Sequence, residues 1–269
     1  MGLSKVSVIT VCYNSAKTLE DAIGSVVNQT YPNLEYIIID GGSTDGTVDI
    51  IKKYKEKISY WISEPDEGIY DAMNKGLKRA TGEWVYFLGS DDYLVSDHSF
   101  TDIFLTRSEL DEFSVICGKV IKYDSKLDYG YVCPPKPLTY EDCRRGVMPP
   151  HQGMLMKRYL IEDYGGFSLE YKIAADLDLF IKFIASNQKI IFIDKVVACF
   201  SEGGMSSSFE NKMKLVRERR NIIKQYRRNN IINYEGFQFL YYKGLINTII
   251  VLILEKIGIW KIIKKSIKK

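Results

Sequence analysis

The 269 residues of the chain, with a mass of 30.9 kDa, suffice for one large α/β domain or for one domain with an appendage. A content of 46% hydrophobic and 26% charged residues, with 20 Gly, 7 Pro and 5 Cys, excludes general disorder and collagen-like, coiled-coil and disulfide-scaffold architectures. The net charge of +3 combines an acidic body with a basic tail. Residues 208–269 contain 15 Lys and Arg against 4 Asp and Glu, and residues 1–207 contain 22 against 30.

The first ninety residues alternate strand and helix patterns. Nearly continuous apolar runs predict four strands, at Val6–Cys12, Glu35–Ile39, Ile58–Ile62 and Trp84–Leu88. Helical periodicity between these runs predicts helices around Leu19–Val27, Val48–Tyr54 and Tyr70–Ala80. Apolar strands that alternate with helices indicate an α/β fold with a mostly parallel central sheet, flanked by helices on both faces.

The rest of the chain is less regular. Residues 113–150 show strand patterns and proline-rich turns without clear helices, which predicts an antiparallel extension and a mobile segment near a binding site. A helix is expected over Ile173–Ile184, followed by strands over Lys189–Asp194 and Val196–Phe200. From residue 209 onward the pattern is helical and basic. We therefore expect one domain over residues 1–207 and a basic amphipathic helical extension over residues 208–269.

Three features bear on where the protein works. The N-terminal apolar run is too short for a signal peptide, no stretch reaches the roughly 18 apolar residues of a membrane span, and the odd number of cysteines without a CxxC pair predicts free thiols. The C-terminal region joins the apolar stretch Leu245–Leu254 to Trp260 and to lysines interleaved with isoleucines. This pattern favours a helix in the membrane interface, on the cytoplasmic face of the inner membrane, although a helix packed on the body is the alternative. The acidic body and the lack of a recognition motif argue against nucleic acid as a partner.

Polar residues follow three of the predicted strands. The first strand ends in Thr10–Asn14, the second in Asp40 and a GGSTDGT turn, and the fourth in Asp91 and Asp92. Ligands of open parallel sheets bind at the carboxyl ends of the strands, so these residues are expected to meet in one crevice. Carboxylates gathered there need a cation or hydrogen-bond donors. Asp91 and Asp92 predict a Mg²⁺ or Mn²⁺ site that also contacts a substrate diphosphate, with a helix N-cap as the alternative.

Four motifs, in order along residues 5–205, resemble the inverting family 2 glycosyltransferases with the GT-A fold. They are VSVITVCYN, YIIIDGGSTDGT, SEPDEGIYDAMNKGLKRATGEWVYFLGSDD and GGFSLEYKIAADLDLFIK. The resemblance implies a metal-dependent enzyme that moves a sugar from a nucleotide sugar, usually a UDP sugar, to an acceptor hydroxyl. The basic, apolar tail suits an acceptor presented on a lipid, such as a polyprenyl-diphosphate-linked oligosaccharide in bacterial surface polysaccharide synthesis.

The resemblance also assigns roles on the donor side. Asp40 matches the residue that binds the pyrimidine ring, with a turn-former before two glycines as the alternative. The other donor-binding residues that the resemblance implies are Thr10, Tyr13, Asn14, Asp71, Asn74 and Asp91. Asp92 matches a metal ligand, and Asp91 the ribose or the metal. The family's leading Asp is absent, because Gly89 stands in its place.

The resemblance places the catalytic base at Asp176, where Ala175 replaces the family's preceding Glu. On a helix Asp178 lies about 200° from Asp176, so both cannot face one cleft, and a supporting or capping role is expected for Asp178. His151 and Gln152 are candidates for contact with the acceptor or the donor sugar, with a structural histidine as the alternative. The FSEGGMS loop at residues 200–206 is expected to close over the diphosphate.

Two other functions remain open on the sequence alone. A sugar nucleotidyltransferase has a related α/β body, but it needs a Gly-rich, Arg-containing loop after the first strand, and CYNSAKT is not such a loop. A catalytically silent nucleotide-sugar-binding or membrane adaptor module is the second alternative. It is supported by the missing Asp and Glu of the two motifs.

Overall fold

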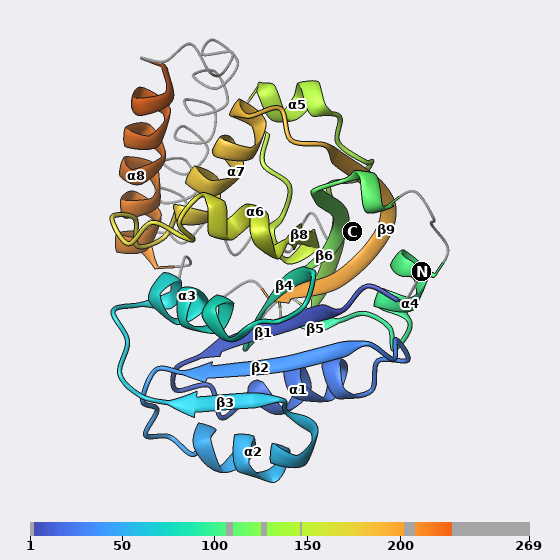
Figure 1. Cartoon of the computed structure of the whole chain (residues 1–269). Coiled ribbons are helices and arrows are strands. Elements are labelled where there is room, and N and C mark those ends of the chain that lie inside the picture. Colours follow the sequence, from blue (N-terminus) through green and yellow to red (C-terminus); the bar gives the residue numbers. More distant parts are fainter. Residues whose placement is uncertain (1–2, 106–109, 125–127, 146, 202–207, 228–269) are drawn as a thin grey trace.

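The structure is a computed structural model that describes residues 3–105, 110–124, 128–145, 147–201 and 208–227 (Figure 1). The strands are β1 (Val6–Cys12), β2 (Leu34–Asp40), β3 (Tyr60–Ser63), β4 (Trp84–Gly89), β5 (Tyr93–Leu94), β6 (Val115–Asp124), β7 (Tyr129–Cys133), β8 (Met154–Lys157) and β9 (Ile190–Ser201). The α-helices are α1 (Leu19–Val27), α2 (Thr47–Lys53), α3 (Ile69–Arg79), α4 (Ser99–Phe104), α5 (Tyr140–Arg144), α6 (Arg158–Asp163), α7 (Ala175–Ala185) and α8 (Phe209–Arg227). Short 3₁₀ helices lie at Lys55–Lys57, Leu110–Glu112 and His151–Gly153.

The strands form one mixed sheet in the order β3-β2-β1-β4-β8-β6-β9-β5, and β7 pairs with β6. The pairs β3–β2, β2–β1, β1–β4 and β6–β9 are parallel, whereas β8 runs antiparallel to both β4 and β6. In the register, Cys12 lies beside Asp40, and Val11 lies beside Gly89. The carboxyl ends of β2, β1 and β4 therefore lie level at one edge of the sheet, as the sequence predicted.

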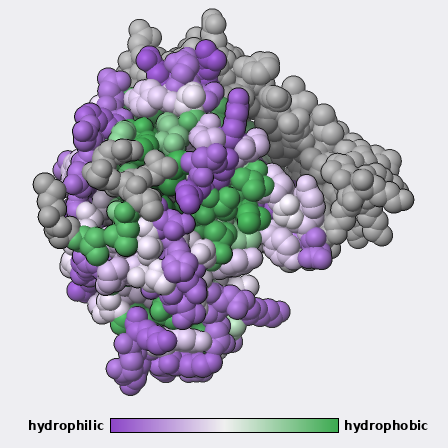
Figure 2. Space-filling view, turned by 90° about the vertical axis from the view of Figure 1, so that its right-hand side faces the viewer, coloured by the Kyte–Doolittle hydropathy of each residue, from purple (hydrophilic) through white to green (hydrophobic). Residues whose placement is uncertain are grey.

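Helices cover both faces of the sheet, which confirms the predicted layers (Figure 1). The helices α1 and α4 pack on one face with apolar residues of β1, β2 and β4. On α1 the buried residues are Leu19, Ala22, Ile23 and Val26, a spacing that puts them on one side of a helix. The opposite face carries α3, α6, α7 and α8 in a second core cluster. Hydrophilic side chains predominate at the bottom of the molecule, around α2 (Figure 2).

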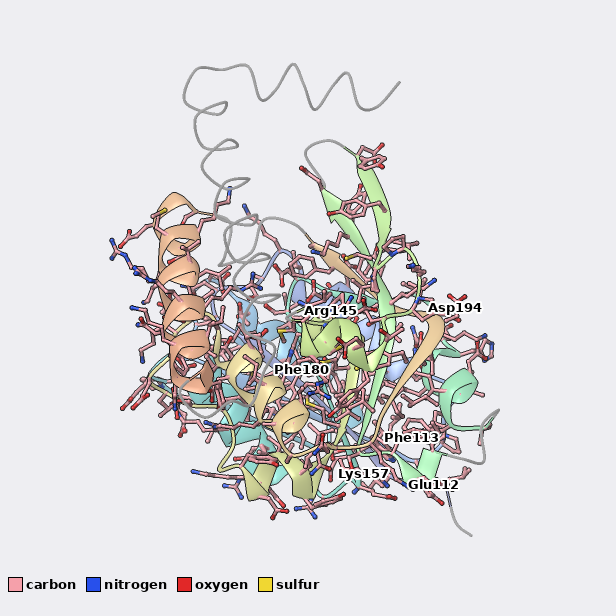
Figure 3. The ribbon with its side chains drawn as sticks, turned by 90° about the horizontal axis from the view of Figure 1, so that it is seen from above. Glu112, Phe113, Arg145, Lys157, Phe180 and Asp194 are labelled. Carbon is pink, nitrogen blue, oxygen red and sulfur yellow. The ribbon has the colours of Figure 1, made fainter. Side chains whose placement is uncertain are left out.

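The second half differs from the sequence prediction in two places. The expected antiparallel extension is present, since β6 and β7 form a hairpin that projects from the body (Figure 3). The segment after it contains the helix α5, begun by a capping box at Thr139, which the sequence reading missed. In addition, β9 is one strand and not two. The polar pair Asp194 and Lys195 marks an irregularity in its register with β6, and Lys119 of β6 forms an ion pair with Asp194 there.

The helix α8 is packed on the body. Ile222, Ile223 and Tyr226 are buried in the core cluster that contains α7, and Figures 1 and 3 show α8 beside α7 in two perpendicular views. Burying side chains of this size contributes about 1.5–3 kcal/mol each. Residues 208–227 of the expected C-terminal extension are thus one helix of the body, and residues 228–269 lie outside the described residues.

Two further observations concern the cysteines and the membrane. All five cysteines are free thiols, and four of them are buried, with Cys133 half-buried. Burial raises the pKa of Cys143 to about 12 and also raises the pKa values of Cys12, Cys117 and Cys199. Within the described residues, no helix is both long and apolar enough to cross a bilayer.

Candidate active site

The end of β2 is built around the carboxylate of Asp40, which is fully buried. Its Oδ2 accepts hydrogen bonds from the backbone N–H groups of Gly42 (3.1 Å) and Ser43 (2.9 Å) and from the hydroxyl of Ser63 (2.6 Å). Its Oδ1 accepts from the hydroxyl of Ser43 (2.5 Å) and the thiol of Cys12 (3.5 Å). A carboxylate has room for about four such donors. Asp40 therefore shapes the turn after β2, and both of its oxygens are engaged in doing so.

The loop after β1 lies against this turn. Asn14, at φ 48°, accepts from Thr44 N–H through Oδ1 (3.0 Å) and donates its own N–H to Ser43 Oγ (2.7 Å). The ring of Tyr13 is 64% exposed, which leaves a face on which a base can stack. Thr10 is fully buried within β1, and its hydroxyl accepts from Tyr36. The side chains of Tyr13 and Asn14 are thus at the surface of the site, and that of Thr10 is inside the sheet.

Asp66, which the sequence analysis did not identify as a site residue, lies beside the same turn. A Cβ atom added to Gly41 would lie 2.5 Å from Oδ2 of Asp66 and 3.4 Å from the ring of Tyr13. The glycine thus lets a half-buried carboxylate and an exposed aromatic ring approach the same stretch of backbone. Asp66 belongs to the SEPDEGIYDAMNKG stretch of the third motif. An acidic residue within that motif is the feature of the sequence that could have marked it as a site residue.

The acidic pair at the end of β4 lies next to the β1 loop. Ser15 and Ser90 are joined by a hydrogen bond of 2.8 Å between their hydroxyls, and the two carboxylates follow Ser90 directly. Asp92 is 2% exposed, and its Oδ1 accepts the N–H of Ser201 at 2.9 Å, while Asp91 is half-buried. A Cβ atom at Gly89 would lie 2.5 Å from Asp92 Oδ2 and 3.0 Å from Asp91 Oδ1. A larger residue at position 89 would therefore displace the pair.

Burial, and after it the neighbouring Asp91, raises the pKa of Asp92 to about 7. Burial also raises the pKa of Asp91. Two adjacent carboxylates, one buried and one half-buried, whose ionised forms are disfavoured in this way fit a hard divalent cation, because Mg²⁺ and Mn²⁺ prefer carboxylate oxygen and supply the missing positive charge. Among the described residues no group of three or more His, Cys, Asp or Glu side chains could hold a metal ion without further ligands. A cation at this pair would need oxygens from a substrate or from water.

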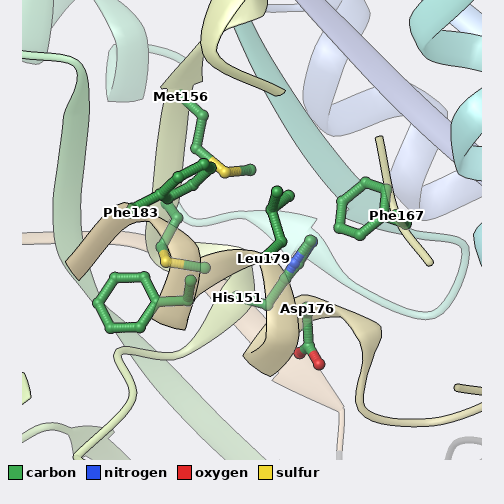
Figure 4. A pocket seen from close by; sticks show the side chains of 8 residues that line it. His151, Met156, Phe167, Asp176, Leu179 and Phe183 are labelled. Carbon is green, nitrogen blue, oxygen red and sulfur yellow. The ribbon is translucent and has the colours of Figure 1, made fainter. Parts of the chain in front are cut away.

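Asp176, the candidate base, lies in the first turn of α7. Its Oδ1 accepts from the hydroxyl of Tyr70 (3.2 Å) and from Leu177 N–H (2.8 Å). An anionic side chain is stabilised at the N-terminus of a helix. Burial and the nearby Asp176 raise the pKa of Tyr70 well above its usual value, so its hydroxyl remains a donor. Asp176 also borders a small apolar cavity, with its carboxylate directed away from Met156 and Phe183 (Figure 4).

The segment His151–Gly153 connects the two acidic centres. The side chain of Gln152 lies near Asp92 and favours its ionised form, and the ring of His151 lines the cavity beside Asp176 (Figure 4). The imidazole stacks on Phe87, with 5.7 Å between ring centroids, and neither of its buried nitrogens has a hydrogen-bond partner among the described residues. Burial lowers the pKa of His151, which keeps the ring neutral. In this short turn, Gln152 thus lies near Asp92, and the preceding residue, His151, adjoins Asp176.

Three other predicted site residues form hydrogen bonds with neighbouring parts of the protein. Asp71 accepts from Glu67 N–H at 3.1 Å, in the first turn of α3. Asn74 exchanges two hydrogen bonds of 2.8 Å with the backbone of Phe167, and so fixes the loop before α7. Asp178 is buried and accepts from Tyr226 of α8 at 3.0 Å. Asp40, Asp91, Asp92 and Asp176 therefore line the strand ends and the adjacent helix, whereas these three side chains support the elements around them.

The sequence model of glycosyl transferase family 2 matches residues 7–163 of the chain, which span β1 to α6. The chain belongs to this family. A PGL/p-HBAD biosynthesis glycosyltransferase of Mycobacterium bovis is 30% identical to this transferase over 218 residues, which cover 79% of this chain and 83% of the relative. The putative teichuronic acid biosynthesis glycosyltransferase TuaG of Bacillus subtilis is 35% identical over 146 residues, which cover 53% of this chain and 58% of TuaG.

Solved structures with the same fold include TarS of S. aureus. Its fragment 1–349 in complex with UDP-GlcNAc matches the transferase with a TM-score of 0.65 at 24% identity, over 81% of this chain and 65% of the fragment. The mannosyltransferase PcManGT of Pyrobaculum calidifontis, in complex with GDP-Man and Mn²⁺, matches with a TM-score of 0.61 at 18% identity, over 94% of this chain and 75% of that chain. These likenesses confirm the GT-A fold expected from the motifs.

Proposed function

We propose that the transferase moves a sugar, with inversion at the anomeric carbon, from a UDP sugar to a hydroxyl of a lipid-linked carbohydrate in bacterial surface polysaccharide synthesis. The observation that carries this proposal is the contact of the His151–Gly153 turn with both acidic centres. It places a candidate metal ligand and a candidate base next to successive residues of one segment. The UDP-GlcNAc complex of TarS supports the donor class, and the PGL/p-HBAD and teichuronic acid biosynthesis named for the relatives supports the acceptor class.

The chain's own residues have distinct parts in this reaction. The ring of Tyr13 stacks on the base, and the carboxylate of Asp66 accepts the imide N–H of uracil beside Gly41. Asp92 and Asp91 would hold a divalent cation, which would supply positive charge for the departing diphosphate. Asp40 contributes by fixing the turn that lies next to Tyr13.

Asp176 acts as the general base. It removes the proton of an acceptor hydroxyl while the oxygen forms a bond to the anomeric carbon, and the bond from that carbon to the diphosphate oxygen breaks. The electron pair leaves with the nucleoside diphosphate, so one displacement inverts the configuration. The hydroxyl of Tyr70 holds one oxygen of Asp176, which leaves the other for the acceptor.

A screen of nucleotide sugars with and without acceptors tests this function. We expect the release of a nucleoside diphosphate from a UDP sugar in the presence of Mn²⁺, with faster release when a lipid-linked acceptor is present. Release of pyrophosphate from a nucleoside triphosphate and a sugar 1-phosphate, in a parallel assay, would instead indicate a sugar nucleotidyltransferase. Nucleotide binding without turnover on any donor and acceptor pair would indicate a silent binding module.

The C-terminal region is expected to bind the membrane surface. Three isoleucines are interleaved with five lysines in residues 261–269, so the charge should attract anionic lipid and the apolar side chains should insert. Deleting residues 237–269 should leave the protein in the supernatant after sedimentation with anionic vesicles, whereas the full chain should pellet. As a control that keeps the charge, replacing Ile262, Ile263 and Ile267 by Ser should leave only weak, salt-sensitive binding. Unchanged sedimentation of the deletion variant would contradict this membrane role.

A further inference from the structure

A buried carboxylate of helix α8 lies against the segment that precedes α7. Glu218 is 8% exposed, and its two oxygens accept the backbone N–H groups of three successive residues: Lys172 at 2.9 Å, Ile173 at 2.9 Å and Ala174 at 3.0 Å. Backbone N–H groups just before a helix lack partners within the helix, and an anion is well suited to satisfy them. The three bonds fix the path of the chain two residues before Asp176.

The same face of α8 binds on both sides of Asp176. Glu218, Ile222 and Tyr226 are spaced four residues apart, so they lie on one side of the helix. Ile222 is buried in the core that contains α7, and the hydroxyl of Tyr226 donates to Asp178 at 3.0 Å. Gln225 accepts from the hydroxyl of Tyr171 at 3.1 Å. The helix therefore forms hydrogen bonds with residues 171–174 and with Asp178, and Asp176 lies between these two points in the sequence.

A short relay leads from Glu218 to the carboxylate of Asp176. The carbonyl of Ile173, whose N–H is bound by Glu218, accepts the hydroxyl of Tyr70 at 2.8 Å. The one proton of that hydroxyl is shared between this carbonyl and Asp176 Oδ1, which lies 3.2 Å away. The position of the Ile173 backbone thus sets the position of the Tyr70 hydroxyl that its carbonyl binds. The hydroxyl in turn orients the carboxylate.

We infer that Glu218 is a positioning residue for sugar transfer: through the 172–174 backbone and Tyr70 it holds the carboxylate of Asp176 toward the acceptor. This inference rests on the proposed function, in which Asp176 is the base. A displacement of about 1 Å at a reacting group can cost on the order of 10²-fold in rate. Since Glu218 lies on α8 and the donor-binding residues lie at the ends of β1, β2 and β4, its loss should change turnover and leave donor binding intact.

Glu218→Gln keeps the size of the side chain but replaces one acceptor oxygen by an NH₂ group that faces N–H donors. We expect kcat for transfer to fall 10- to 100-fold, with the KM for the donor and the Mn²⁺-dependent affinity for UDP unchanged. Glu210→Gln is the matched control, because Glu210 is an exposed carboxylate on the same helix. It should leave every parameter at the value of the parent enzyme.

A double-mutant cycle separates positioning from a general structural role. If Glu218 acts through Asp176, then Glu218→Gln should cause no further loss in an Asp176→Asn background, because the group that it positions is already absent. An equal loss in both backgrounds, or a fall in UDP affinity that parallels kcat, would overturn the inference. If Glu218→Gln does not yield folded protein, Tyr70→Phe, which removes the hydroxyl of the relay, enters the same cycle, and additivity there would overturn it too.

The two proposals fail in different ways. An active parent enzyme and an inactive Asp176→Asn variant, together with a fully active Glu218→Gln variant, would refute only the positioning role. A parent enzyme that transfers no sugar from any donor would refute the proposed function, and the positioning role would fall with it.

Discussion

Asp176→Asn is expected to lower kcat for sugar transfer by at least two orders of magnitude while the variant still binds UDP. A general base contributes about 10²–10⁴-fold, and an amide cannot accept the acceptor's proton. The amide oxygen can still accept the hydroxyl of Tyr70, so the local structure should persist. Steady-state kinetics with donor and acceptor measure the loss, and calorimetry with UDP and Mn²⁺ measures the binding.

The control for this substitution is Asp163→Asn, which changes an exposed carboxylate at the end of the neighbouring helix α6. This variant should retain full turnover. Normal turnover by Asp176→Asn would show that another group takes the proton, and the assignment of the base would then be wrong.

Asp92→Asn should abolish the Mn²⁺-dependent part of UDP binding and, at the same time, stabilise the protein in EDTA at alkaline pH. The pKa of Asp92 in the fold is about 7, above the ordinary value of 3.8. The folded state therefore binds a proton more tightly than the unfolded state does, and metal-free stability falls as the pH rises from about 4 through 7. An amide has no such ionisation and can still accept the N–H of Ser201.

Thermal unfolding in EDTA measures the stability effect. The Asp92→Asn variant should unfold at a higher temperature than the parent at pH 8, and this difference should be smaller at pH 5. The exposed Asp97 provides a control, since Asp97→Asn should shift neither unfolding nor Mn²⁺-dependent binding. Retention of full Mn²⁺-dependent binding by Asp92→Asn would remove Asp92 from the metal site.

The parts of the site at the strand ends could be predicted because their signals are local. A buried strand must be apolar along its length, so the polar residues at Asp40 and at Asp91–Asp92 mark where the strands end. Parallel neighbours then bring those ends to one edge. The same argument fails at β9, where the polar pair Asp194 and Lys195 marks a register shift within one strand, because Lys119 on the neighbouring strand provides a partner for Asp194.

The supporting contacts could not be predicted, because their partners are distant in sequence or are backbone groups. Glu218 accepts three backbone N–H groups some 45 residues earlier, and backbone donors leave no trace in the amino-acid sequence. Asn74 similarly binds the backbone at Phe167. Asp178 was placed away from Asp176 by helical geometry alone, but its partner Tyr226 lies on a helix whose narrow apolar face gave no sign of where it packs.

Because the thiols differ in burial, one cysteine, Cys133, can be labelled selectively with a thiol-reactive reagent. A maleimide reacts with a thiolate, and Cys12, Cys117, Cys143 and Cys199 are buried and have raised pKa values, so they resist such reagents. Cys133, at the end of β7, is more accessible. A fluorophore coupled to it would report on the β6–β7 hairpin without any engineered mutation, and single-molecule experiments on acceptor capture could begin from the unaltered protein.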